Sequence, residues 1–304
     1  MLRYAIRRLI TSVVTLFLVI TLTFFLMQAV PGGPFLGENV NPEVTERIMA
    51  KYGYDQPLGV QYIKYLNALL HGDLGESMVV KSGDPVTQII AEHFPISLKL
   101  GLIALAIAVF LGIPLGVLAA VKHDSIFDRC FVFFASFFVS IPSFIMTVAL
   151  MMVFGVWLQV LPVAQLTDWT SYLMPVFGMA IYPMFNLARL TRTTMLDVTG
   201  QDYIKTARAK GLSTFKIMFK HALRNAILPV VTALGPLIAG ILTGSFVVEK
   251  VFAISGIGKY FISSISSRDY QLIMGTTIFF AVLLIGCNYV VDLLYGVIDP
   301  RIKM

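Results

Sequence analysis

Four histidines and one glycine–lysine segment are the groups in this sequence best suited to catalysis or to holding a metal or a nucleotide. The histidines are scattered and have no cysteine partners, which does not fit a metal site: His71, His93, His123 and His221. Residues 255–260, SGIGKY, look like the end of a phosphate-binding P-loop. However, Ala253 stands where that motif needs its first glycine, and Tyr260 replaces the hydroxyl residue that would bind Mg²⁺. We therefore predict no enzyme activity and no metal, nucleotide or other cofactor on this chain.

Residues 202–229 form the only long polar and basic segment in the second half of an otherwise apolar sequence. Asp202 can cap a first helix, because its carboxylate can accept N–H groups of the first turn. Gly211 tolerates the left-handed conformation that ends such a helix, and Ser213 can cap a second one. The pattern predicts a helix–turn–helix between two membrane spans that can dock against a cytoplasmic partner.

The second of these helices is predicted to carry an apolar face and a basic stripe. The apolar face consists of Phe215, Met218, Phe219, Ala222 and Ala226, and the stripe of Lys216, Lys220 and Arg224. Small residues before the glycine, Ala207 and Ala209, permit close approach by a partner. Two other interpretations are an ordinary loop whose cations only set the topology and a DNA-binding helix–turn–helix; the adjoining spans argue against nucleic acid.

The composition indicates a protein that crosses a membrane several times. Of the 304 residues, 57% are apolar and 13% are charged, whereas soluble domains contain about 25% charged residues. The apolar runs predict six spans of roughly 20 residues or more: 9–30, 100–121, 131–160, 171–188, 229–248 and 272–291. The third is long enough to require tilt or a bend at Pro142. Cys130 and Cys287 are expected to be small apolar residues and not a disulfide.

Glycine pairs and an external segment add detail to this layout. Spans two and five contain GxxxG spacings that permit close helix contact: Gly112 with Gly116, and Gly240 with Gly244. Residues 31–98 are mixed in character and are predicted to form helices at 42–51, with Asn41 as its cap, and at 60–70. A short further helix is expected from Pro85 to Glu92.

The distribution of lysines and arginines predicts the orientation of the chain in the membrane. Most of the 23 lysines and arginines fall in segments that the layout places on one side, together with both termini, which the positive-inside rule assigns to the cytoplasm. The six spans, as bounded above, contain no charged residue or histidine, so proton coupling within the membrane is hard to build. Their polar groups can serve either helix contacts or a substrate path: Ser136, Ser140, Ser143, Thr147, Tyr182, Asn186, Thr232, Thr243 and Asn288. Energy for active transport would have to come from another chain.

Several motifs, in order and over essentially the whole length, resemble one known family. They are PGGPF at 31–35, GDLG at 72–75, SIP at 140–142, residues 203–212 followed by HALRNA at 221–226, VEKVF at 248–252 leading to GIG at 256–258, and DPR at 299–301. The sequence resembles the permease subunits of bacterial peptide-importing ABC transporters, the dipeptide, oligopeptide and nickel group, and within it the oligopeptide permeases.

The resemblance implies a coupling loop at 189–228 whose helix fits a cleft of an ATPase subunit. The implied contact positions are Thr206, Ala207, Arg208, Ala209, Lys210, Gly211 and Leu212. The sequence departs from the general family pattern, in which Leu-Pro follows the glycine by about a dozen residues. Leu223 and Arg224 stand there instead, and Leu228-Pro229 follows five residues later, a variant shared within the peptide group.

The resemblance also implies the assembly, the fold and the cell location. The expected partners are a sister permease, two ATP-binding subunits that supply ATP and Mg²⁺ sites, an extracytoplasmic peptide-binding protein, the peptide and membrane lipid. The expected fold is an all-α polytopic membrane protein with six transmembrane helices in a bacterial cytoplasmic membrane. We expect its parts to be a first span at 1–30, an external segment at 31–98, a permease core at 99–295 and a cytoplasmic tail at 296–304. The alternatives are the same machinery carrying dipeptides, nickel chelates or another small solute, and a passive channel or scaffold.

Overall fold

The computed structural model describes residues 2–30, 42–242 and 246–298, and its regular elements there are helices apart from one isolated bridge between Glu76 and Pro85. The α-helices are α1 Leu2–Ala29, α2 Pro42–Tyr52, α3 Leu58–Leu70, α4 Val86–Val121, α5 Ile126–Ser140, α6 Ser143–Leu150, α7 Leu173–Thr199, α8 Asp202–Ala209, α9 Thr214–Lys216, α10 Leu223–Leu242, α11 Phe246–Val251, α12 Ile257–Ser266 and α13 Tyr270–Ile298. Two π-helical stretches, η1 Met151–Trp157 and η3 Ile217–Ala222, and the 3₁₀ turn η2 Thr170–Tyr172 complete the set. The all-helical fold expected from the sequence is confirmed.

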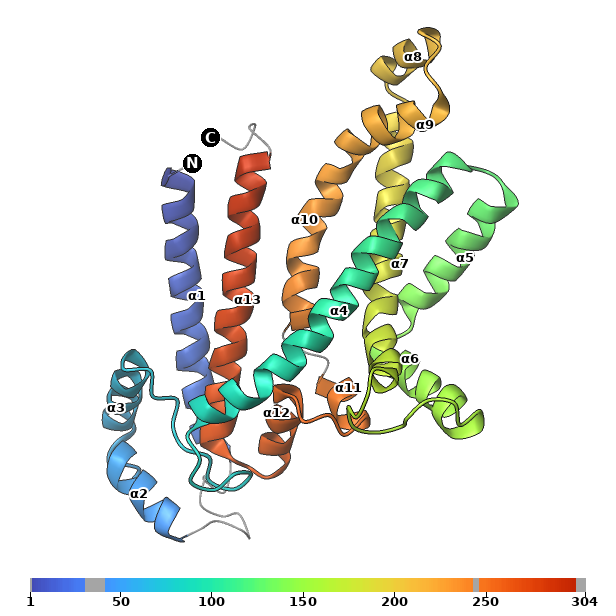
Figure 1. Ribbon diagram of the computed structural model, residues 1–304. Coiled ribbons are helices and arrows are strands. Elements are labelled where there is room, and N and C mark those ends of the chain that lie inside the picture. The colour runs from blue at the N-terminus through green and yellow to red at the C-terminus, as the bar shows by residue number, and fades with distance from the viewer. Residues whose placement is uncertain (1, 31–41, 243–245, 299–304) are drawn as a thin grey trace.

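The long helices α1, α4, α7, α10 and α13 run between two ends of the molecule (Figure 1). Helices α4 and α7 form the most extensive contact, α10 packs against α7 and α13, and α1 packs against α13. Helices α2, α3, α11 and α12 gather at one end, which we call the outer end. Helices α8 and α9 project from the other end, where α1 begins and α13 finishes (Figure 1).

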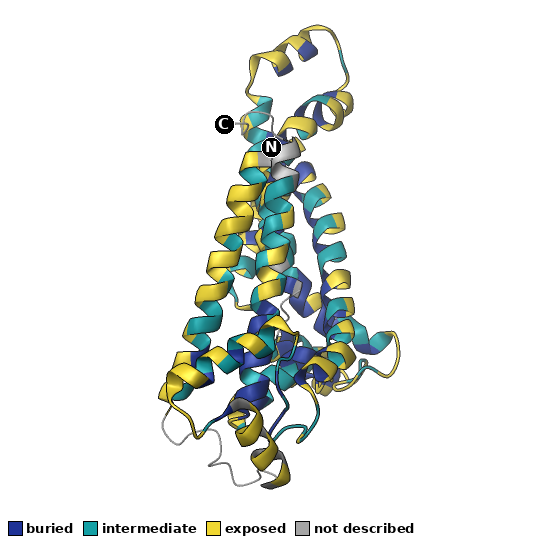
Figure 2. Cartoon of the chain, turned by 90° about the vertical axis from the view of Figure 1, so that its left-hand side faces the viewer, coloured by how far each residue is buried: buried dark blue, intermediate teal, exposed yellow. Residues whose placement is uncertain are grey.

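Five helices are long and apolar enough to cross a membrane, or six spans are present if one bent pair counts as a single span. The five are 3–29, 86–121, 170–199, 214–238 and 270–293, and the bent pair is 126–140 with 143–157. These correspond in order to the six spans predicted from the sequence. Many residues along these helices are exposed, which Figure 2 shows in yellow, and a large number of the exposed residues are apolar.

The third predicted span is broken and not merely tilted. Its two parts, α5 and the α6–η1 segment, meet at an angle of 102°. Ile141 has the extended backbone (φ −92°, ψ 124°) that a residue before proline prefers, and Pro142 then occupies the N-cap position of α6. The bend expected at Pro142 is confirmed, but it is sharp enough to turn the chain across the direction of α5.

Three predicted boundaries differ from the structure because hydropathy identifies the apolar part of a helix, which lies in the membrane, and not the full length of that helix. The short helix expected from Pro85 to Glu92 is the beginning of α4, which continues through Pro95, so the expected division between 98 and 99 falls inside a helix. The fourth span extends to Thr199, which takes the first part of segment 189–228 into α7. The fifth begins well before Pro229, since transmembrane helices tolerate interior prolines.

The contact between α4 and α7 depends on the first glycine pair. A Cβ atom on Gly112 would lie 2.5 Å from the backbone oxygen of Met184, and one on Gly116 would collide with the backbone oxygen of Ala188. The close approach predicted from this GxxxG spacing is therefore confirmed. At the second pair, a Cβ on Gly240 would meet nothing within 4 Å, and Gly244 lies outside the described residues.

Replacing Gly112 with alanine is expected to destabilise the protein by about 1–3 kcal/mol, the usual penalty for overpacking. The obstacle is backbone of α7, which cannot swing aside as a flexible side chain could. The matched control is Gly286→Ala in α13, where an added Cβ would meet nothing within 4 Å. Thermal unfolding in detergent should show a lower melting temperature for Gly112→Ala alone; equal melting temperatures would contradict the assigned contact.

At the outer end, the external segment packs on the membrane helices. Helices α2 and α3 match the two predicted helices closely, while Asn41 lies outside the described residues. Tyr65 of α3 is buried in one cluster with Phe24 of α1 and with Met274 and Ile278 of α13. This segment is thus fixed to the first and last spans and is not a separate unit.

Two buried carboxylates, which the sequence analysis did not identify, organise the same end. Asp269, fully buried, accepts hydrogen bonds from the backbone N–H groups of Met78, Val79, Val80 and Leu272 at 3.0–3.2 Å and from the Ser77 hydroxyl at 2.6 Å. It thereby ties the turn after α3 to the start of α13.

Glu249 of α11 performs a similar task at the beginning of α12. Its carboxylate accepts the backbone N–H groups of Gly258 at 2.9 Å and Lys259 at 3.3 Å. Ser97 of α4 accepts the Ile257 N–H beside it, and burial raises the pKa of the Glu249 carboxyl. The segment that resembled a P-loop is therefore a helix start whose N–H groups already donate to Glu249 and Ser97 of the same chain.

Candidate coupling hairpin and membrane cavity

The segment after α7 forms two helices joined by a tight turn, residues 202–222, which we call the coupling hairpin. Gly211 has φ +74°, and its N–H donates to the Arg208 carbonyl at 2.9 Å. The Ser213 hydroxyl accepts the Lys216 N–H and caps α9. The predicted glycine turn and serine cap are confirmed. The predicted cap at Asp202 is wrong by one residue, because Gln201 occupies the N-cap position and Asp202 begins the helix.

An apolar cluster attaches the hairpin to the membrane helices. The cluster joins residues of α4, α7, α8, η3 and α10: Val117, Ala120, Met195, Ile204, Ala207, Ile217, Met218, Ala222 and Ala226. Asn225 of α10 also donates to the Tyr203 hydroxyl of α8 at 2.7 Å. The hairpin therefore moves with the ends of α4 and α7 and is not a loose loop.

The seven positions implied as ATPase contacts differ in accessibility. Five are exposed: Thr206, Arg208, Ala209, Lys210 and Gly211. Leu212 is half-buried, and Ala207 is 7% exposed within the cluster of this chain. The small size of Ala207 thus serves packing inside the chain, while the exposed members surround the turn.

Positive charge dominates the hairpin surface. Its exposed cations are Lys205, Arg208, Lys210, Lys216 and Lys220, and Arg224 follows on α10. Asp202 is the only carboxylate between 202 and 222, and it pairs with Lys205 at 2.8 Å on the open surface. Such a surface favours an acidic partner.

The apolar face predicted for the second helix is correct in part. Met218, Ala222 and Ala226 are buried as predicted, but Phe215 is 71% exposed and Phe219 is 45% exposed, and Ile217 is buried in their place. The reason is the π-helical stretch η3, whose hydrogen bonds join residues five apart and so rotate the buried face. The two phenylalanine rings contact each other in a tilted arrangement, with 4.5 Å between their centroids.

One histidine and two aspartates around the start of α5 resemble a metal site, but one of the aspartates binds an arginine of α7. Single ligand atoms of His123, Asp124 and Asp128 lie within 4.8 Å of one another. Arg192 of α7 donates to both oxygens of Asp128, at 2.5 and 2.7 Å. The buried Asp128 therefore joins α5 to α7 through a bidentate ion pair.

A cavity of about 590 Å³ lies among α6, α7 and α10. Three of the polar span residues noted in the sequence line it: Ser143, Tyr182 and Asn186. Others bond to carbonyls of their own helix instead, as Ser140, Thr147 and Thr232 do; Thr243 lies outside the described residues. The cavity is mainly apolar with a few separated polar groups.

Comparison with known proteins decides the family. Residues 112–304 match the family described as the binding-protein-dependent transport system inner membrane component, and residues 1–101 match the N-terminal region of the membrane components of such systems. The chain belongs to this family. It is therefore a transmembrane permease subunit of an ABC transporter, a class that has no catalytic activity or cofactor of its own and works with ATPase and binding-protein partners.

Full-length relatives of this permease include subunits of peptide transport systems. It is 47% identical to the dipeptide transport system permease protein DppB of Bacillus subtilis (strain 168), covering 100% of this chain and 99% of that protein. It is 42% identical to the oligopeptide transport system permease protein OppB of Haemophilus influenzae, with 100% of both chains covered.

A solved structure supports the fold of the permease. A chain of the MetNI methionine ABC transporter in an inward-facing conformation matches with a TM-score of 0.60 and 16% identity. The match covers 70% of this chain and 97% of that one. At this identity, the likeness concerns the fold alone.

Proposed function

We propose that this permease forms half of the membrane path of an ATP-driven importer of peptides, together with a sister permease. Two ATP-hydrolysing subunits would bind on the hairpin side, and an extracytoplasmic peptide-binding protein would bind at the outer end. The observation that carries this proposal is the full-length identity of 42–47% to two peptide permeases. Both chain termini would then lie in the cytoplasm, on the side of the hairpin.

The coupling hairpin is the proposed contact with an ATPase subunit. Its exposed positions Thr206, Arg208, Ala209, Lys210 and Gly211 surround the turn, and its positive charge suits an acidic cleft. Because Ala207 and Leu212 lie beneath this surface, they support its shape. The cavity lined by Ser143, Tyr182 and Asn186 is the proposed wall of the peptide path.

Oligopeptides are the proposed cargo, as expected from the sequence resemblance, and OppB supports this choice. Dipeptides are the second candidate, which the 47% identity to DppB favours. Uptake of labelled peptides of two to five residues, in cells lacking their own peptide permeases and supplied with the complete transporter, distinguishes the two. Preferential uptake of the longer peptides supports the first candidate, whereas uptake of dipeptides alone supports the second.

The assembly is tested by purifying the tagged permease in gentle detergent with its co-expressed partners. We expect recovery of a second permease and two ATPases, and reduced ATPase recovery from the double variant Arg208→Glu, Lys210→Glu. Arg129→Glu is the matched control, since Arg129 is an exposed cation near the same end but outside the hairpin. Unchanged ATPase recovery from the double variant would reject the docking role, and recovery of this chain alone would favour a channel or scaffold.

A further inference from the structure

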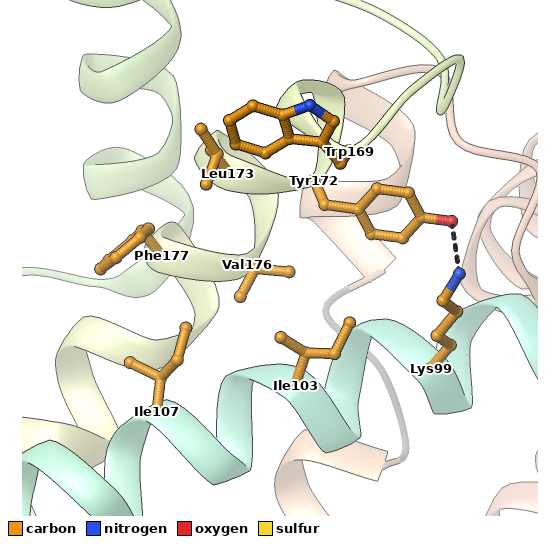
Figure 3. Close-up of a pocket in the computed structure, with 8 residues that line it drawn as sticks. All are labelled: Lys99, Ile103, Ile107, Trp169, Tyr172, Leu173, Val176 and Phe177. Atoms are coloured by element: carbon orange, nitrogen blue, oxygen red, sulfur yellow. Dashed lines mark hydrogen bonds between the residues drawn. The ribbon is translucent and has the colours of Figure 1, made fainter.

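A groove of about 430 Å³ lies between α4 and the start of α7, and its lining residues differ from those of the proposed peptide path. Figure 3 shows Ile103 and Ile107 of α4 facing Val176 and Phe177 of α7, with Lys99 at one end of the row. Ile103 is 37% exposed and Phe177 is 40% exposed. The groove is therefore open along its apolar length and is not a closed packing defect.

The groove begins at the boundary of the membrane's hydrocarbon. From Leu100 to Val121, α4 contains no charged residue, and at 1.5 Å per residue these 22 positions extend about 33 Å, close to the ~30 Å of a hydrocarbon core. Lys99 consequently lies at the polar edge on the side of the outer end. Trp169 and Tyr172, which precede α7 at that edge, are the residue types enriched there.

The ammonium group of Lys99 is held by the side chain of Tyr172. Its ammonium nitrogen lies 3.2 Å from the Tyr172 hydroxyl and 4.7 Å from the centroid of the same ring. Within the described ranges, no Asp or Glu forms an ion pair with Lys99 at 4.0 Å or less. An ammonium group is thus held in place at the mouth of an apolar groove, with its charge available to an anion.

We propose that this groove binds an anionic phospholipid from the leaflet on the side of the outer end. The phosphate would lie against Lys99 and the Tyr172 hydroxyl, and one acyl chain would lie along Ile103, Ile107 and Phe177. A phospholipid matches both parts of the groove. Its charged headgroup can contact Lys99 while its acyl chain contacts the apolar residues, and lipid is already present at that depth. Proteins recognise such headgroups through basic groups beside transmembrane helices.

Native mass spectrometry of the assembled transporter tests this, with phosphatidylglycerol as the probe and phosphatidylcholine as the comparison. Lys99→Gln and the groove-filling Ile103→Trp are expected to reduce retained phosphatidylglycerol at least fivefold. The matched controls are Lys122→Gln, which removes a cation from the opposite end of α4, and Leu102→Trp, which places the same ring on an exposed neighbour that does not line the groove. Both controls should retain the lipid as the unmodified protein does.

Two results would overturn the proposal. Equal retention of phosphatidylglycerol by Lys99→Gln, Ile103→Trp and their controls would show that no lipid is held by this groove. Loss of the sister permease from Ile103→Trp, with lipid retention unchanged, would show that a protein helix covers the groove instead.

Discussion

Replacing Asp269 with alanine is expected to lower the free energy of unfolding by roughly 3–5 kcal/mol. The substitution leaves four backbone N–H groups and the Ser77 hydroxyl without their acceptor in a buried site, and each unsatisfied buried donor costs about 1–3 kcal/mol. The turn that includes Met78 should separate from the start of α13. Limited proteolysis between residues 71 and 85, with thermal unfolding, measures both consequences.

The matched control is Asp84→Ala in the same turn. Asp84 is a half-exposed carboxylate whose ion pair with Lys81 is 3.9 Å long, so its removal should change the melting temperature by little. Asp269→Asn should resemble Asp269→Ala, because an amide presents one acceptor oxygen where the carboxylate presents two. If the Asp269 and Asp84 variants unfold and digest alike, the carboxylate does not fasten this segment.

Replacing Ala207 with aspartate is expected to detach the coupling hairpin and to abolish transport while leaving the spans inserted. The new carboxylate would enter the apolar cluster beside Ile204 and Ile217, and burying a charge without a partner costs several kcal/mol. The cost can be relieved by releasing the hairpin into water. Trypsin, which has sites at Lys205, Arg208 and Lys210, should then cut the hairpin much faster, and peptide uptake should fall at least tenfold.

Ala209→Asp separates this effect from direct docking. Ala209 is an exposed residue on the same helix, so an aspartate there should not speed tryptic cutting of the hairpin, whatever it does to binding of an ATPase. Equal cutting rates for the two aspartate variants would mean that Ala207 does not hold the hairpin in place.

The residue types at the turn were enough to predict much of the hairpin's backbone structure. The turn follows from Gly211, whose positive φ few other residues adopt easily, and Ser213 is a cap that sequence alone can identify. The burial of Ile217 and the exposure of Phe215 and Phe219 depend on a π-helical stretch. Because a sequence pattern assumes 3.6 residues per turn, it cannot locate such a stretch.

The outer carboxylates were missed for a different reason. The partners of Asp269 are mostly backbone N–H groups almost 200 residues away, and backbone donors have no signature in a sequence. One local signal was available, since Asp269 directly precedes α13 in the position that caps a helix. For the membrane helices, apolar runs identified every span, but the polar extensions of α4 and α7 beyond the bilayer needed the structure.

Helix α4 has a mechanical consequence that follows from its length. Its 36 residues extend about 54 Å, and they contribute Ile89 to the cluster with α12 and α13 at one end and Val117 to the hairpin cluster at the other. Because α4 and α7 pack together along most of their shared length, a displacement of the hairpin would be transmitted to the outer end by the two helices moving together. Bending would concentrate at Pro95 and Pro114, where the helical hydrogen bonding is interrupted.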